Sequence, residues 1–381
     1  MSIPFNVPYM NGRELFNISQ AYNRRWLAGD GPFTKRCEAM LSERLGGCPT
    51  YLTHSGTAAL ELALLALELQ PGDEVVVPSF TFVSCANAVL VAGGTPVFAD
   101  IDPQTQNLSL ASLQRVVGDR TRALIVVHYA GIASELAQII AFARSRGIAV
   151  VEDAAHCLCA HYRGHELGTL GDFGCFSFHE TKNITCGEGG ALAVNDPKYV
   201  QRVEVLREKG TDRSQFMRGM VDKYTWRDRG SSYLPSEISA AFLEAQLNDS
   251  DLVTRNRVES WSDYHELFAE AEAEGLLQRP HLPAESTNNG HIYYVLVADG
   301  DTRDQVIASL KRLEIQATFH YVPLHSSPYG SQFRCDPHGM EVTRSNASRL
   351  LRMPLWYGIG GEQRKLVASS VRLILQNMQR T

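Results

Sequence analysis

Short, mostly apolar runs recur along the first half of the chain, separated by amphipathic segments. They cover residues 74–78, 96–100, 123–128, 147–153 and 175–178. Continuous apolar runs are typical of strands buried on both faces, and strands that alternate with helices form parallel sheets. The pattern therefore predicts an α/β fold with a mostly parallel central sheet. Ligands of such sheets bind beyond the carboxyl ends of the strands.

The amphipathic segments predict helices. After Thr57, apolar residues follow the spacing i, i+3, i+4, i+7 of a helix. The last third of the chain reads as α+β, so we expect a large domain over residues 1–250 and a smaller one over 251–381. Strands are predicted in the smaller domain at 292–297 and 315–321, and helices at 253–274, 302–313, 344–352 and 361–376.

Composition narrows the class of protein. The chain has 381 residues, 44% of them hydrophobic, and a net charge of −6, which disfavours a nucleic-acid surface. Its first residues lack the basic and apolar regions of a signal peptide, and no apolar run has the length of a membrane span. The 8 cysteines are scattered, without the paired spacing of a zinc site. We expect a cytoplasmic protein with reduced thiols, no membrane contact and no metal.

One lysine stands out, because it follows a buried strand directly. Lys182 comes four residues after the run 175–178. Desolvation at the edge of a pocket lowers the pKa of an ammonium group, and the neutral amine can attack a carbonyl such as that of pyridoxal 5'-phosphate (PLP). The alternative is a solvated loop lysine, which is the commoner case for a single lysine.

Small hydroxyl residues precede the helix that begins near Thr57. Ser55 and Thr57 offer hydroxyl groups and Gly56 permits close approach of the backbone, so this helix start suits a phosphate. Simple N-capping needs only one of these residues and remains the alternative. Phe82, soon after the strand 74–78, could stack on a flat cofactor ring or pack in the core.

Two polar residues follow the strand 147–153 at the expected ligand edge of the sheet. Asp153 could pair with a protonated pyridine nitrogen, or it could cap a helix. His156 could hydrogen-bond a cofactor or be a packed histidine.

Two further stretches are rich in chemical groups. Residues 210–229 are polar and irregular and combine cations with aromatic rings, which suits an anion next to a flat base. A solvated surface loop is the alternative. Residues 320–325 include two histidines and a tyrosine, which could line a substrate pocket or pack.

Taken together, these motifs resemble the sugar aminotransferases of the DegT/DnrJ/EryC1 type. The resemblance runs almost end to end, and its order and spacing are specific. It implies a PLP enzyme of the aspartate-aminotransferase fold (fold type I). The segments that carry it are 55–59, 78–82, 152–156, 177–182, 187–190 and 320–325.

The resemblance also implies residue roles. Lys182 would bind PLP covalently and move the proton, and Asp153 would pair with the pyridine nitrogen. His156 would face the ring hydroxyl and Phe82 would stack on the ring. The phosphate contacts would be Gly56, Thr57, Ser177 and, from the partner subunit of a homodimer, Ser232, which stands where the family has an asparagine.

Segments 178–183, 207–211 and 222–228 resemble, within this family, the transaminases that form dTDP-4-amino-4,6-dideoxygalactose. This implies transfer from L-glutamate to C4 of dTDP-4-keto-6-deoxyglucose, as used in surface polysaccharide biosynthesis. The expected substrate contacts are Arg213, Tyr224, Trp226, His320, Tyr321 and His325.

Other functions stay open. Another UDP- or dTDP-linked keto-sugar could be the acceptor, with a 3-keto group or a gluco-configured product. In PLP sugar dehydratases related to this family a histidine replaces the lysine, so Lys182 argues against that reaction. An intact lysine, aspartate and phosphate seat also argue against a non-catalytic regulator of the same fold.

Overall fold

The computed structural model describes residues 2–133 and 135–380. Its centre is a seven-stranded sheet in the order β1-β9-β8-β5-β4-β2-β3. Only β9 runs antiparallel to its neighbours, so the sheet is mostly parallel, as predicted. The strands are β1 (Thr50–Thr53), β2 (Glu74–Pro78), β3 (Thr95–Ala99), β4 (Thr121–Val127), β5 (Ala149–Asp153), β8 (Phe173–Ser177) and β9 (Gly190–Val194).

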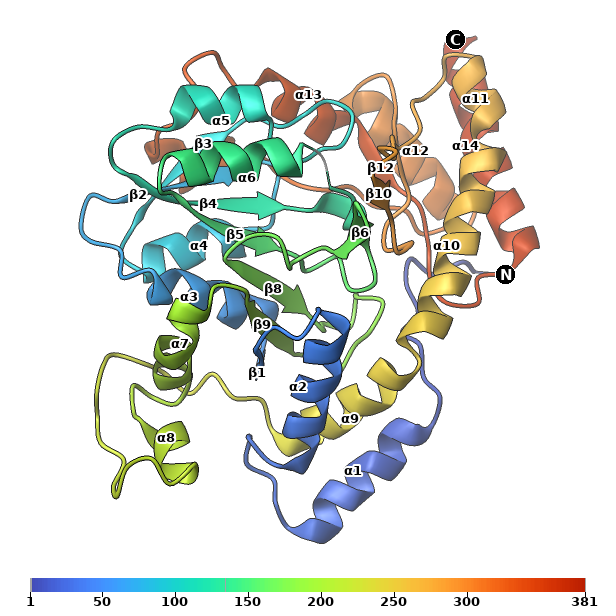
Figure 1. Cartoon of the computed structure of the whole chain (residues 1–381). Helices are drawn as coiled ribbons and strands as arrows, with labels where there is room; N and C mark the ends of the chain where they lie inside the picture. Colours follow the sequence, from blue (N-terminus) through green and yellow to red (C-terminus); the bar gives the residue numbers. More distant parts are fainter. Residues whose placement is uncertain (1, 134, 381) are drawn as a thin grey trace.

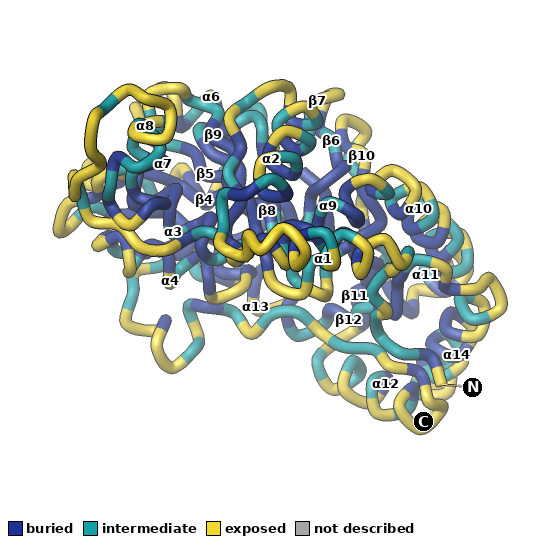
Figure 2. The backbone as a smooth tube through the Cα atoms, turned by 90° about the horizontal axis from the view of Figure 1, so that it is seen from below, coloured by how far each residue is buried: buried dark blue, intermediate teal, exposed yellow. Residues whose placement is uncertain are grey.

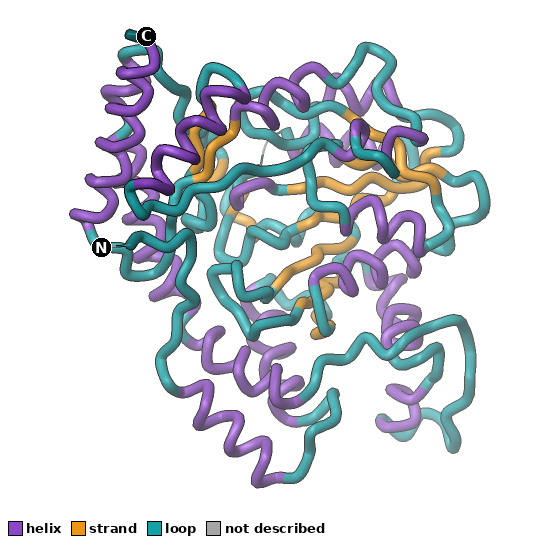
Figure 3. The backbone as a smooth tube through the Cα atoms, turned by 180° about the vertical axis from the view of Figure 1, so that it is seen from behind, coloured by secondary structure: helices purple, strands orange, loops and turns teal. Residues whose placement is uncertain are grey.

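Helices cover both faces of this sheet (Figures 1 and 3). One face packs against α3 (Gly56–Ala66), α4 (Ser84–Val91) and α7 (Val200–Arg207). The other packs against α2 (Pro32–Arg44), α5 (Leu110–Val116), α6 (Leu136–Ser145) and α9 (Glu237–Asn248), with α1 (Arg13–Arg24) outside α2 and α9.

Burial on both faces explains the apolar runs. In β2, Val76 belongs to one hydrophobic cluster while Val75 and Val77 belong to the cluster on the opposite face. Successive side chains of a strand point to opposite faces, so both sets must be apolar.

A smaller unit follows α9, and its helices pack around a third cluster. It contains a two-stranded sheet and the long helix α10. The N-terminal residue Ile3 packs in the same cluster and pairs with Ile315. Its elements are α10 (Ser250–Leu267), α11 (Ala269–Ala273), β11 (Tyr294–Leu296), α12 (Gly300–Arg312), α13 (Glu341–Arg349), β12 (Leu350–Arg352) and α14 (Gly361–Gln379).

The domain boundary after residue 250 stays a proposal. It is supported by the start of α10 at Ser250 and by the separate cluster that this helix helps to form. The position of Ile3 means that the first residues of the chain pack with the smaller unit.

Two predicted elements of the smaller unit are wrong. Residues 315–321 form no strand and make only single bridges, such as Thr318 with Arg352. Residues 350–352 belong to strand β12, not to the end of a helix, because they pair antiparallel with β11. Pairing with a partner distant in sequence overrides the local helical pattern here.

Short elements complete the chain. Within the polar stretch 210–229 lies α8 (Arg213–Met217). None of the helices in the described part of the chain is long and apolar enough to cross a membrane. The other short elements are β6 (His161–Tyr162), β7 (His165–Glu166), β10 (Ser286–Thr287), η1 (Tyr129–Gly131), η2 (Pro197–Tyr199), η3 (Leu324–Ser326) and η4 (Gly330–Gln332).

Candidate active site

A cavity of about 430 Å³ lies where the strands β5 and β8 end and where the smaller unit faces the sheet. In Figure 1 the arrowheads of β4, β5 and β8 point toward α10. The volume is that of a small-molecule site. Nine of the predicted site residues line it: Gly56, Thr57, Phe82, Asp153, His156, Ser177, Lys182, His320 and Tyr321.

The start of α3 forms one end of the cavity. Ser55 is the N-cap, and its hydroxyl accepts a hydrogen bond from the backbone of Ala58 at 3.1 Å. A Cβ on Gly56 would lie 2.8 Å from the Cβ of Ser177, so only glycine allows β8 to approach this closely. Free N–H groups at a helix start, with hydroxyl groups on both sides, form a seat for a phosphate.

Lys182 lies in the turn after β8, and its side chain faces the cavity. Burial, together with the charge of Arg352, lowers the pKa of its ammonium group to about 8, although the charge of Asp153 acts in the opposite direction. A sizeable fraction of this amine is therefore neutral near physiological pH, which a nucleophilic lysine requires.

Asp153 ends β5 at the floor of the cavity and is only 8% exposed. Its carboxylate accepts hydrogen bonds from the thiol of Cys85 at 3.0 Å and from the backbone of Ala155 at 3.1 Å. Burial and the neighbouring carboxylate raise the pKa of the Cys85 thiol well above its usual value, so this thiol stays a neutral donor. A turn and not a helix follows Asp153, so it does not cap a helix.

His156 lines the cavity next to Asp153 in sequence. Its Nδ1 accepts a hydrogen bond from the backbone of Ala130 at 3.3 Å, which puts the proton of the neutral ring on Nε2. Burial lowers the pKa of His156 well below its usual range, with the charge of Lys182 as the next cause. The ring is therefore a neutral donor.

The smaller unit supplies the facing wall. The rings of His320 and Tyr321 stack at 4.1 Å between centroids. His320 Nε2 lies 2.5 Å from Arg352 Nη1, and its Nδ1 lies 3.2 Å from the hydroxyl of Tyr129. A guanidinium can only donate, so Nε2 accepts and Nδ1 carries the proton. Burial, with Arg352, lowers the pKa of His320 to about 2.

Phe82 stands at the mouth of the cavity with 58% of its surface exposed. An exposed aromatic ring beside an open cavity is available to cover a flat ligand.

Five predicted residues do not line this cavity within one chain. His325 instead hydrogen-bonds Ser79 at 2.7 Å. Ser232 makes a backbone bridge with Glu208, and Arg213 forms an ion pair with the same glutamate at 2.9 Å. The remaining two are Tyr224 and Trp226.

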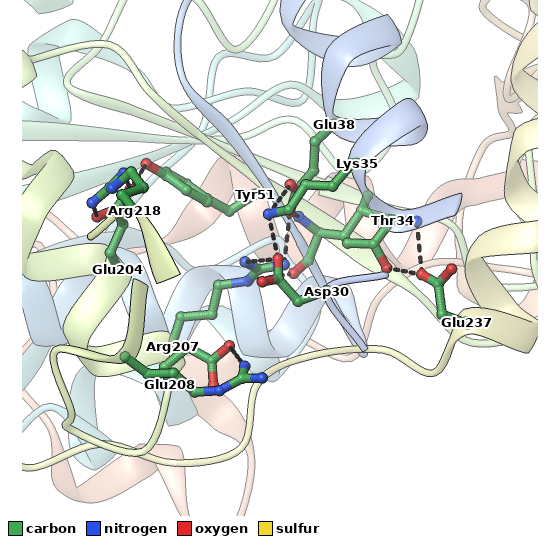
Figure 4. Close-up of polar contacts among 12 residues, drawn as sticks. Asp30, Thr34, Lys35, Glu38, Tyr51, Glu204, Arg207, Glu208, Arg218 and Glu237 are labelled. Carbon is green, nitrogen blue, oxygen red and sulfur yellow. Dashed lines mark hydrogen bonds and ion pairs between the residues drawn. The ribbon is translucent and has the colours of Figure 1, made fainter. Parts of the chain in front are cut away.

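These two aromatic residues lie in an arm, residues 212–229, that extends from α7 away from the central sheet (Figure 1). Trp226 is 81% exposed. Figure 4 shows part of the ion-pair network at its base, where Arg218 donates to Glu204 at 2.8 Å and Arg207 to Glu38 at 2.7 Å. The ion pair of Arg218 thus ties the arm to α7, although Tyr224, like Trp226, is more than half exposed.

Among the lining residues that sequence reasoning missed, four contribute a ring or a charge. Phe5 comes from the N-terminal segment, Arg257 from α10, His291 from the loop before β11 and Arg352 from β12. Both arginines lie in segments predicted as amphipathic helices, where a solvated arginine is ordinary, so no local signal marks them.

The cluster fits PLP. A lysine with a lowered pKa, a buried carboxylate and a helix start with hydroxyl groups lie around one cavity. They match, in order, the aldehyde, the pyridine nitrogen and the phosphate of this cofactor.

Comparison with known proteins agrees with this geometry. The profile of the DegT/DnrJ/EryC1/StrS aminotransferase family matches residues 8–372. GDP-perosamine synthase of Caulobacter vibrioides is 34% identical over 84% of this chain and 85% of its own. The dTDP-4-dehydro-2,3,6-trideoxy-D-glucose 4-aminotransferase of Saccharopolyspora spinosa is 30% identical over 98% of this chain and 97% of its own.

A solved structure supports the same conclusion. The aminotransferase TlmJ of Streptoalloteichus hindustanus superimposes with a TM-score of 0.90 at 30% identity and covers 99% of this chain and 100% of its own. The predicted fold, that of PLP-dependent sugar aminotransferases, is confirmed.

Proposed function

We propose that this chain, which belongs to the DegT/DnrJ/EryC1/StrS aminotransferase family, moves the amino group of L-glutamate to C4 of dTDP-4-keto-6-deoxyglucose. The product is dTDP-4-amino-4,6-dideoxygalactose. The family consists of PLP-dependent transaminases that act on nucleotide-linked sugars, so the enzyme class and the cofactor follow from membership. The glutamate donor, the dTDP-keto-sugar and the position and configuration of the new amine are the parts that need a test.

Each half of the reaction needs a proton moved at the substrate carbon. PLP, when bound, supplies an electron sink for the charge that develops at that carbon. The Nζ of Lys182 is the proton carrier, since its lowered pKa lets it both take and give a proton near neutral pH. Asp153, at the base of the cavity, would hold the protonated pyridine nitrogen of PLP, and the start of α3 would hold its phosphate.

The observation that carries the proposal is the convergence of Lys182, Asp153 and the phosphate seat on one cavity. Amination at C4 of a dTDP-sugar is supported by the name of the Saccharopolyspora spinosa relative, a 4-aminotransferase. The Caulobacter relative is named for a GDP-sugar, so the nucleotide has to be tested directly.

The test offers purified enzyme L-glutamate with dTDP- and UDP-linked 4-keto-6-deoxyglucose and with a 3-keto isomer. We expect preference for the dTDP-4-keto sugar, a product mass that corresponds to the amine, and an axial C4 amine by NMR. Preference for the UDP or 3-keto sugar would overturn the substrate, and an equatorial amine would overturn the galactose product.

A homodimer is part of this proposal. Figure 2 shows α1 and α8 largely exposed, and on and just after α1 five large apolar residues face solvent: Leu15, Phe16, Tyr22, Trp26 and Leu27. An exposed apolar patch of this kind suits a protein interface. A second copy on this side could also bring its arm, with Arg213, Tyr224, Trp226 and the nearby Ser232, to the mouth of the cavity.

Sedimentation at assay concentration tests the dimer, with Phe16→Asp as the disruptive variant. The control is Leu313→Asp, because Leu313 is also an exposed apolar residue but lies in the smaller unit. Wild type and the control should sediment as dimers and Phe16→Asp as a monomer with weak activity. A fully active wild-type monomer would exclude the dimer.

A further inference from the structure

Asp153 is a buried carboxylate whose two oxygens have different partners. Oδ1 accepts a hydrogen bond from the backbone of Ala155 at 3.1 Å, and Oδ2 accepts one from the thiol of Cys85 at 3.0 Å. No cation within residues 2–133 and 135–380 forms an ion pair with it. Each carboxylate oxygen has two lone pairs, so both oxygens can still accept from a bound group. The chain thus fixes the direction of this carboxylate and leaves its charge without an ion pair.

The contact with Cys85 is specific to one of three neighbouring thiols. Burial, together with the charge of Asp153, raises the pKa of Cys85, Cys157 and Cys175 well above the usual value of a thiol. Cys157 donates instead to the backbone carbonyl of His128 at 3.6 Å. Cys175 is the register partner of Asp153 between β5 and β8, yet its thiol donates to none of the described residues. Cys85 is the thiol of this group that donates to the carboxylate.

Cys85 is itself held from its other side. It lies in the first turn of α4, and its side chain is fully buried. The hydroxyl of Thr81, a residue that lines the cavity, lies 3.3 Å from its sulfur. The thiol proton points to Asp153, so the hydroxyl is the donor in this contact. Two hydrogen bonds in series therefore run to the carboxylate from the loop that also carries Phe82 at the cavity mouth.

We propose that Cys85 is a positioning residue of the transaminase, whose thiol orients the carboxylate of Asp153 toward the pyridine nitrogen of PLP and so keeps that nitrogen protonated. This rests on the proposed function, in which Asp153 pairs with the nitrogen. A thiol suits the task because it is a neutral donor. It fixes the direction of the carboxylate without cancelling the charge that a pyridinium needs, as a lysine or an arginine would.

A purely structural role for Cys85 is the alternative, since a buried thiol also packs like a small apolar group. Packing needs only the volume of the sulfur, whereas positioning needs the donated proton. Cys85→Ala removes both, and Cys85→Ser keeps a donor of similar size that can still accept from Thr81. Cys175→Ala is the matched control, because it removes an equally buried sulfur beside Asp153 that makes no hydrogen bond to it.

The first readout is the ring nitrogen. Solid-state NMR of the holoenzyme, with PLP that carries ¹⁵N in the ring, distinguishes a pyridinium from a neutral pyridine. Wild type, Cys85→Ser and Cys175→Ala should give the pyridinium resonance, and in Cys85→Ala the resonance should move toward that of a neutral pyridine.

The half-reaction with L-glutamate, followed by absorbance, gives the kinetic readout. The kcat of Cys85→Ala should fall roughly tenfold, the size of one lost hydrogen bond to a charged group. Its KM should change less than about threefold, because the thiol acts through Asp153 and not on glutamate. Cys85→Ser should stay within about threefold of wild type in both parameters.

Infrared spectroscopy of the whole chain tests the hydrogen bond without PLP. The S–H stretch moves to lower frequency when a thiol donates, and difference spectra against Cys85→Ser and Cys175→Ala assign the two bands. The band of Cys85 should lie below that of Cys175. It should move to higher frequency in Asp153→Asn, because an amide oxygen is a weaker acceptor than a carboxylate. This measurement does not depend on the folding of Cys85→Ala.

Three results would overturn the inference. Equal S–H frequencies for Cys85 and Cys175 would show that Asp153 receives no proton from the thiol. An unchanged pyridinium resonance in Cys85→Ala, with the resonance moved in Asp153→Asn, would reject the positioning role alone and leave Asp153 in place. An unchanged resonance in Asp153→Asn would reject the proposed role of Asp153, and the role of Cys85 would fall with it.

Discussion

Arg207 and Arg352 are both arginines withdrawn from bulk solvent, yet their surroundings differ. At the base of the arm, Arg207 donates to Glu38 at 2.7 Å and to the carbonyl of Leu52 at 2.9 Å, and Asp30 lies 3.9 Å away (Figure 4). At the cavity, Arg352 has the neutral His320 and no carboxylate among the described residues. Pairing within the chain marks a charge that serves the fold, whereas a missing partner marks a charge available to a ligand.

The same contrast extends to the groups around them. The network of Figure 4 pairs Arg218 with Glu204 and Glu237 with the start of α2, so its charges are nearly all satisfied within one chain. In the cavity, Lys182 forms no ion pair with any described residue, and its pKa is lowered to about 8. Substitutions in the two regions should therefore damage different properties.

The largest expected effect is that of Lys182→Ala. Without its amine no group can carry the proton at the substrate carbon, so transamination should fall by roughly 10⁴-fold. Single-turnover absorbance measures it, and Lys209→Ala, an exposed lysine on the arm side, is the control that should keep activity within about twofold. Borohydride should fix PLP to the peptide that contains Lys182, and a label on a different lysine would refute the assignment.

Arg207→Met should act on stability instead. Removal of Arg207 breaks the buried pair and leaves Glu38 with Lys35 alone, at 3.3 Å, as its counter-charge, which costs about 3 kcal/mol of unfolding free energy. Urea unfolding measures the loss, and the kcat/KM for glutamate of the protein that remains folded should stay within about threefold of wild type. A large fall in kcat/KM at normal stability would break the distinction between the two regions.

Asp153→Asn should reduce activity by about 100-fold, because a neutral amide cannot hold the positive charge of a pyridinium nitrogen. The amide oxygen can keep only one of the hydrogen bonds that Cys85 and Ala155 donate to separate oxygens of Asp153, so we expect the melting temperature to fall by only a few degrees, about the loss of one hydrogen bond. Kinetics together with a thermal melt check this, with Asp304→Asn on the surface of α12 as the control. Near-normal turnover would mean that Asp153 acts only in the local turn.

Much of the fold and part of the site could be predicted from the sequence. The apolar runs located β2, β3, β4, β5 and β8, since burial on both faces leaves a continuous signal. Lys182 and Asp153 were predicted from their places at the ends of those strands. Both residues are positioned by the strands that they follow, and the apolar runs of those strands can be recognised in the local sequence.

The smaller unit was harder to predict from the sequence. Strand β12 depends on a partner more than fifty residues away, so residues 350–352 were predicted as helix. That error hid Arg352, whose role depends on the facing wall of the cavity and not on its neighbours in sequence. The aromatic residues of the arm were correctly seen as unusual, but the sequence does not say that their surroundings within one chain are mostly solvent.

The smallest effect, and the sharpest test of the charge contrast, is the pH dependence of PLP uptake by the apo protein. Only the neutral amine of Lys182 can react, so with a pKa of about 8 the rate should rise about tenfold from pH 7 to pH 9 and then level off. An ordinary lysine, with a pKa near 10.5, would give a rise of about 100-fold over the same range without a plateau.

The charge of Asp153 raises the pKa of Lys182 and that of Arg352 lowers it. The midpoint should therefore move to lower pH in Asp153→Asn and to higher pH in Arg352→Gln, while Arg207→Met leaves it in place. Stopped-flow absorbance across pH 6 to 10 measures all four proteins. Equal midpoints in wild type and Arg352→Gln would show that the guanidinium lies too far from Lys182 to act on its charge.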